Sequence, residues 1–77
     1  MVLGGERFRL VKEYRNAVEL EAIVRERLGE NVALQVHSDR LVDWVANVFG
    51  PPEMVLRHQM AVERISVRLR RRFHLKN

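Results

Sequence analysis

The sequence predicts a small α+β domain with the element order βαββα, in which two helices pack on one face of a three-stranded antiparallel-type sheet. Three observations predict it. Apolar and polar residues alternate in two short segments, as they do in half-buried strands. A capped helix separates these segments, and a longer amphipathic helix follows a double proline. With 77 residues, the chain is expected to form a single domain over residues 1–77, whose core is marginal for its size.

Two segments carry the alternation that is typical of strands. In the first, the apolar residues at even positions are Phe8, Leu10 and Tyr14. In the second they are Val32, Leu34 and Val36. Each segment therefore predicts a strand with one buried face.

The segment between them predicts a helix with both ends capped. Asn16 suits the N-cap, and Glu19, three residues later, completes a capping box. Gly29 suits the left-handed position after the last turn. Apolar residues recur at helical spacing at Leu20, Ile23, Val24 and Leu28.

The segment "SDRLVDWVANVFGPPEM", residues 38–54, fits two structures. As a helix, it has a cap at Ser38 and apolar residues at helical spacing. As a strand, it is rich in β-branched residues and follows a Ser/Asp-containing link typical of hairpins. In the strand interpretation, residues 38–40 form the turn, and the third strand runs from Leu41 to about Val48. A hairpin partner would give the sheet a third strand, which favours independent stability.

The last element is predicted to be one long helix from Glu53 to about Arg72, after Pro51 and Pro52. At 100° per residue its apolar residues form two stripes, roughly 150° apart. The first stripe comprises Val55, Val62, Ile65, Leu69 and Phe73. The second comprises Leu56, Met60 and Val67. Because one stripe suffices to cover a sheet, the second is a candidate protein interface, unless both belong to one wide face.

A row of arginines lies on the same predicted helix, at Arg57, Arg64, Arg68 and Arg71, and Arg70 and Arg72 add to it. Residues 1–52 carry a net charge of −1, whereas residues 53–77 carry seven Lys/Arg and two Glu, a net of +5. Guanidinium groups fork onto phosphate oxygens, so such a row can follow a nucleic-acid backbone. The alternative is a solvated face in which the arginines also favour the helix C-terminus. No base-reading motif accompanies the row.

The sequence argues against several classes of function. It has no cysteine, and its three histidines have no metal-ligand spacing, so neither a metal site nor another cofactor is expected. Nothing assembles a nucleophile, a base and a pocket, so the protein is not expected to be an enzyme. No apolar run approaches the length of a membrane span, and we expect a cytoplasmic protein.

Two blocks of the chain resemble a known family, the CTAG/Pcc family, which is the small dimerising subunit of the KEOPS complex. "FRLVKEYRNAVELEAIVRERL" is similar to the opening of the family, where a strand ends in a Tyr-x-Asn-like turn before a helix. "LVDWVANVFGPPEMVLRHQMAVERI" is similar to its closing strand and long helix, which a Leu-Arg pair opens, here Leu56-Arg57. "VALQVHSDRLV" takes the place of the hairpin, so the resemblance favours a strand at residues 41–48.

The resemblance implies a non-catalytic scaffold. Family members pair through their sheets, dock by their helices onto the catalytic Kae subunit, and help to hold tRNA for N6-threonylcarbamoylation of the adenosine next to the anticodon. The expected partners are therefore a Kae-type subunit, a second copy of the chain, and tRNA. The alternatives are a stand-alone dimeric nucleic-acid-binding regulator and a purely structural oligomerisation module.

Overall fold

The computed structural model describes residues 12–76 and has an α+β fold with the order βαββαβ. Its elements are β1 Glu13–Arg15, α2 Ala17–Leu28, β2 Leu34–Asp39, β3 Asp43–Val48, α3 Pro52–Arg70 and β4 Phe73–Leu75. The α+β class and the order of the first five elements are as predicted, and β4 is an addition.

The strands form two sheets instead of the predicted three-stranded sheet. β2 and β3 pair antiparallel as a hairpin, and β1 pairs parallel with β4. The first predicted strand is represented by β1, which begins at Glu13, whereas Phe8 and Leu10 lie outside the described residues. The prediction of one sheet is wrong because β1 pairs with β4, a strand that begins at Phe73, where the sequence pattern continues the apolar stripe of the long helix.

Helix α2 begins and ends as the sequence predicts. The side chain of Asn16 accepts a hydrogen bond from the Glu19 amide at 2.8 Å, and Glu19 accepts one from the Asn16 amide at 2.9 Å. This reciprocal pair satisfies two amides that the first turn leaves free. Gly29 has φ 78°, and its N–H donates to the carbonyl of Arg25, which closes the helix.

The ambiguous segment forms a strand, with a turn two residues later than predicted. β2 continues through Ser38 to Asp39, and Asp39 pairs with Asp43 across the turn. Asp39 Oδ1 accepts hydrogen bonds from the amides of Leu41 at 2.8 Å and Val42 at 3.2 Å. Asp43 has φ 86°, a left-handed conformation that aspartate tolerates better than most residues. The side chain of Asp39 therefore builds the turn that the sequence placed at residues 38–40.

Helix α3 starts at Pro52 and ends at Arg70, two residues before the predicted end. The amides of Arg71 and Arg72 bond to Arg68 and Leu69 in tight turns that end the helix. Phe73, predicted to continue the helical stripe, is buried in β4 instead. Trp44 Nε1 donates to the Phe73 carbonyl at 3.1 Å, which attaches β4 to the hairpin.

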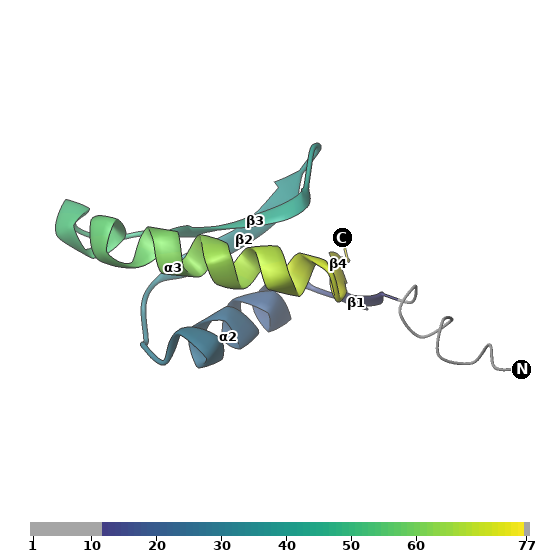
Figure 1. The fold of residues 1–77 in the computed structure, drawn as a ribbon, viewed down its shortest axis with the longest axis horizontal. Helices are drawn as coiled ribbons and strands as arrows, with labels where there is room; N and C mark the ends of the chain where they lie inside the picture. The colour runs from purple at the N-terminus through teal and green to yellow at the C-terminus, as the bar shows by residue number, and fades with distance from the viewer. Residues whose placement is uncertain (1–11, 77) are drawn as a thin grey trace, which may run out of the picture.

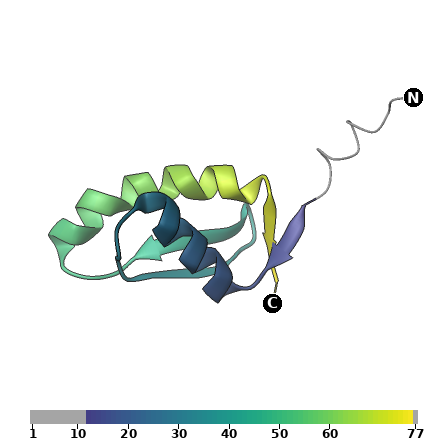
Figure 2. The same ribbon diagram turned by 90° about the horizontal axis from the view of Figure 1, so that it is seen from below.

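Both helices cover the same face of the hairpin, as predicted, with α2 mainly along β2 and α3 along β3 (Figure 1). The short β1–β4 sheet lies at one end of α3 (Figure 2). The core fills the space between these layers, and Trp44 is its largest fully buried side chain. Within α3 the buried residues include Val62 and Leu69 of the predicted stripe, together with His58 and Ser66.

The outer edge of β2 is covered by polar side chains of α2. Alternate residues of an antiparallel strand direct their N–H and C=O groups away from the partner strand. Arg25 donates to the carbonyl of Val32 from Nε at 2.8 Å and to that of Leu34 from Nη2 at 3.4 Å. Glu21 Oε2 accepts from the Val36 amide at 2.9 Å. These contacts satisfy backbone groups that would otherwise be available to another strand.

The outer edge of β3 is covered in the same way by α3. Gln59 accepts from the Val48 amide at 2.9 Å and donates to the Ala46 carbonyl at 3.2 Å. Arg70 donates to the carbonyl of Trp44 at 2.9 Å, and its guanidinium lies 5.7 Å from the centre of the indole ring. Thus each helix closes the free edge of the strand beneath it.

Candidate nucleic-acid interface

The four arginines predicted to bind phosphate are all exposed, three of them on α3 and the fourth at its C-terminal cap. Arg57, Arg64, Arg68 and Arg71 are exposed, and none forms an ion pair with an acidic residue in the described part of the chain. Helical spacing places the first three on one side of the helix, with Arg71 at its C-terminal cap. We call these four residues the arginine row.

Arg70 has a different role from its neighbours in the sequence. It is mostly buried, with a side chain only 13% exposed, and Glu63 Oε2 accepts a hydrogen bond from its guanidinium at 2.9 Å. A second nitrogen of the same guanidinium donates to the carbonyl of Trp44 in β3. The sequence grouped Arg70 with the basic cluster, but the structure uses it to hold α3 against β3.

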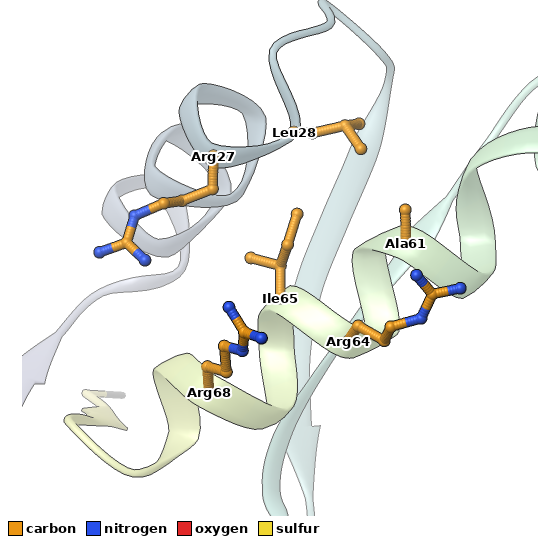
Figure 3. Close-up of a pocket in the computed structure, with 6 residues that line it drawn as sticks. All are labelled: Arg27, Leu28, Ala61, Arg64, Ile65 and Arg68. Carbon is orange, nitrogen blue, oxygen red and sulfur yellow. The ribbon is translucent and has the colours of Figure 1, made fainter.

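A hollow with a volume of about 300 Å³ lies between α2 and α3. Three arginines line it, but only Arg68 directs its guanidinium toward the opposite helix, whereas those of Arg27 and Arg64 extend away from the space between the helices (Figure 3). Its lining comprises Arg27, Leu28, Ala61, Arg64, Ile65 and Arg68. Leu28 and Ile65 project into the space between the helices, and Arg68 extends toward α2 (Figure 3). We call this site the arginine hollow. It combines an apolar floor with the guanidinium of Arg68 at its rim.

Arg27 is the residue of this site that sequence reasoning missed. It belongs to the nearly neutral first two thirds of the chain, where its charge is offset by neighbouring glutamates. Packing of α2 against α3 brings it to the same hollow as Arg64 and Arg68. Its place in the last two turns of α2 was visible in the sequence, but its proximity to α3 depended on the packing of the two helices.

The second apolar stripe lies outside the core. Leu56, Met60 and Val67 are 80%, 68% and 42% exposed. By helical geometry they lie next to the arginine row, on the side of α3 that faces away from α2. Large aliphatic side chains exposed along one helix face are typical of protein-interaction surfaces, so the predicted interface stays a prediction for these residues.

A histidine and an aspartate come together at the end of the hairpin. His74 Nδ1 lies 2.7 Å from Asp43 Oδ2, and the imidazole packs on the ring of Tyr14 with centroids 4.9 Å apart. These contacts link β4 to β3 and β1. Asp43 and His74 lie 31 residues apart in the sequence.

The other histidines also have structural contacts. His37 Nε2 lies 2.8 Å from the amide nitrogen of Asn47 across the hairpin, and the buried His58 lies 3.9 Å from a carboxylate oxygen of Glu30. Residues 12–76 contain no group of three or more His, Cys, Asp or Glu arranged to hold a metal ion. Neither described helix combines the length and the hydropathy needed to cross a bilayer.

Comparisons with protein-family models, with curated proteins and with solved structures found no match to this chain. The resemblance to the KEOPS subunit therefore stays a hypothesis. The features that bear on function are the arginine row, the arginine hollow and the apolar stripe.

Proposed function

We propose that this chain is a non-catalytic RNA-binding scaffold that contacts the RNA phosphate backbone through the arginine row of α3. The observation that carries the proposal is the set of exposed guanidinium groups on one side of α3 without an acidic partner among the described residues. A solvated helix face normally interleaves charges of both signs, whereas here only Glu53 and Glu63 offset the row.

Phosphate binding by such a row is driven largely by the release of counterions from the nucleic acid. Each guanidinium that reaches a phosphate adds to the affinity and to its dependence on salt. Backbone contacts position a protein without reading the bases. The chain is therefore expected to bind RNA with weak sequence preference and to depend on a partner for the choice of target.

The apolar stripe is the surface that we assign to a protein partner. Its residues are exposed along α3, whereas described backbone groups on the outer edges of both hairpin strands bond to side chains of the helices. Docking through a helix face is thus favoured over addition of a strand to the hairpin. In the specific form suggested by the family resemblance, the partner is a Kae-type catalytic subunit and the RNA is a tRNA modified to N6-threonylcarbamoyladenosine.

The same exposed stripe favours one alternative, a dimer that binds nucleic acid without another subunit. A C2 dimer would bury the stripe of one copy against that of the other. Light scattering on the purified chain distinguishes the dimeric regulator from the scaffold that binds another subunit. A dimer that Leu56→Ser/Met60→Ser converts to a monomer supports the regulator, whereas a monomer that forms a stable complex with a Kae-type subunit supports the scaffold.

The RNA-binding proposal is tested by reversing two charges of the row. Arg64→Glu/Arg68→Glu is expected to weaken binding of a tRNA by about 100-fold at low salt, because attraction to the phosphates becomes repulsion. Both side chains are exposed, so the fold should be retained, and the thermal midpoint of unfolding should fall only slightly, because a glutamate in the last turn of α3 is disfavoured by the helix dipole. Fluorescence anisotropy with labelled tRNA measures the affinity.

The matched control is Arg40→Glu/Lys76→Glu, which changes the net charge by the same amount at exposed positions outside α3 and outside the arginine row. It should keep most of the affinity. Equal losses in the two variants would reduce the effect to net charge, and unchanged affinity in Arg64→Glu/Arg68→Glu would overturn the proposal.

A further inference from the structure

We propose that the arginine hollow holds one unstacked nucleotide of a single-stranded RNA segment, with a phosphate on Arg64 and Arg68 and the base against Leu28 and Ile65. The inference rests on the proposed RNA-binding function and adds a binding site and a class of RNA to it. It follows from the apolar floor of the hollow beside its charged groups. A row of charges on a helix surface would have no such floor.

The rim of the hollow supplies the groups that a phosphate requires. Arg27, Arg64 and Arg68 come from two helices, and no described carboxylate pairs with any of them. Guanidinium groups form paired hydrogen bonds to phosphate oxygens, with a geometry that lysine cannot reproduce. Arg68 already extends across the hollow, and rotation of the exposed side chains of Arg27 and Arg64, which extend away from it, would let adjacent phosphates of one strand be contacted from both helices.

The floor of the hollow supplies a surface for a base. Leu28 and Ile65 are only half-buried although both pack on the hydrophobic core, so each keeps an apolar surface open to the hollow. Ala61 keeps the α3 side of the floor low because its side chain is a single methyl group. A volume of about 300 Å³ falls at the lower end of the range for small-ligand sites, which suits a single nucleotide.

This combination favours single-stranded over double-stranded RNA. In a duplex the bases are stacked and paired, and only the backbone and groove edges reach a protein surface. An unstacked base can leave the strand and cover the apolar floor, and an arginine plane can stack on its other face. The lining contains arginine and aliphatic side chains only, so we expect little discrimination between bases.

The deciding experiment fills the hollow without removing an arginine. Ala61→Leu introduces a good helix former whose side chain would occupy the floor. Ala22→Leu, at an exposed position of α2 that does not line the hollow, is the matched control. Affinity is measured by anisotropy for a single-stranded RNA of about 12 nucleotides, several times the single-nucleotide site, and for the duplex of the same sequence. The fold of each variant is verified by circular dichroism.

The wild-type chain and Ala22→Leu should bind the single strand more tightly than the duplex, because only the single strand can place a base between the apolar floor and an arginine plane. Ala61→Leu should lose this preference and keep its affinity for the duplex. Arg27→Ala, a surface change that leaves the row intact, should also reduce the preference and provides a test that does not depend on accommodation of the new leucine.

The outcomes separate the two proposals. Equal binding of single strand and duplex by the wild-type chain, or a preference that survives in Ala61→Leu and Arg27→Ala, overturns the nucleotide site and leaves backbone binding standing. Failure to bind either RNA at low salt overturns both proposals.

Discussion

Arginines of α2 and α3 have different roles at the hairpin edges and in the arginine hollow. At the edges, Arg25 and Arg70 donate to strand carbonyls and are partly withdrawn from solvent. Arg27 lies two residues from Arg25, and Arg68 two residues from Arg70. Both line the hollow, and neither has an acidic partner in the described part of the chain. The side of the helix on which an arginine lies therefore determines whether it stabilises the fold or remains available to a ligand.

The need for two kinds of helix side chain follows from the hairpin itself. Without the helices, both of its outer edges and both of its faces would be open to solvent. A two-stranded hairpin is marginal in water without packing partners. The helices supply both an apolar face and polar partners for the edges, so each helix contributes a half-buried and an exposed set of charged or amide side chains. We expect substitutions at the edges to change folding stability and substitutions in the hollow to change RNA affinity.

The largest effect on stability is expected for Arg70→Ala. The change removes the bond to the Trp44 carbonyl, the ion pair with Glu63 and the packing on the indole ring. Loss of a charge-assisted bond and of the partner of a strand carbonyl should lower the free energy of unfolding by about 2–3 kcal/mol, measured by urea denaturation. Arg71→Ala, one residue along and exposed, is the control and should change it by less than about 0.5 kcal/mol.

Gln59→Ala should have the next largest effect, about 1–2 kcal/mol, because two backbone groups of β3 lose their partner. The open edge should also promote association through strand pairing, visible as concentration-dependent oligomers in light scattering. Gln59→Glu is an informative comparison, since its carboxylate can still accept from the Val48 amide but cannot donate to Ala46. If Gln59→Ala is as stable and as monodisperse as the parent chain, the bonds from Gln59 to the strand edge have no protective role.

A smaller effect, about 1 kcal/mol, is expected for Glu21→Ala on the edge of β2. The change leaves the Val36 amide without its acceptor. Hydrogen exchange at that amide, followed by NMR, should become faster. In Glu21→Gln the amide oxygen can still accept, and protection should be retained; equal exchange rates in the two variants would contradict the assignment.

The smallest effect on stability is expected for Leu56→Ser/Met60→Ser, on the apolar stripe. Both side chains are mostly exposed, so the free energy of unfolding should change by less than about 0.5 kcal/mol. RNA affinity should also be retained, because neither residue lines the hollow. Binding to a protein partner, measured by co-purification, should be abolished, and a partner that still co-purifies would place its interface elsewhere.

Local sequence signals predicted the parts of the fold whose determinants are local. The capping box at Asn16 and Glu19 and the glycine at position 29 specify both ends of α2. The apolar periodicity of α3 predicted the buried Val62 and Leu69 and separated them from the exposed second stripe. For residues 38–54 both periodicities fitted, and the strand formed because alternate residues of β3 complete the face that the helices cover.

The features that the sequence did not predict depend on interactions between distant residues. β4 is three residues long, and its carbonyl and amide partners on Trp44 and Asp43 lie 29 and 32 positions away. Arg70 looked like part of the basic cluster, since its direction toward the strand edge becomes evident only when β3 is in place. Arg27 likewise joined the candidate site only through the packing of α2 on α3.

The most direct test of the distinction between structural and available arginines is the salt dependence of RNA affinity for Arg68→Ala and Arg70→Ala. Both variants are measured side by side with a single-stranded RNA, at a temperature where both are folded. Removing one arginine that binds a phosphate should make the slope of log K against log salt shallower by about 0.7. We predict this reduction for Arg68→Ala and a slope equal to that of the parent chain for Arg70→Ala. Equal slopes for the two variants would contradict the distinction.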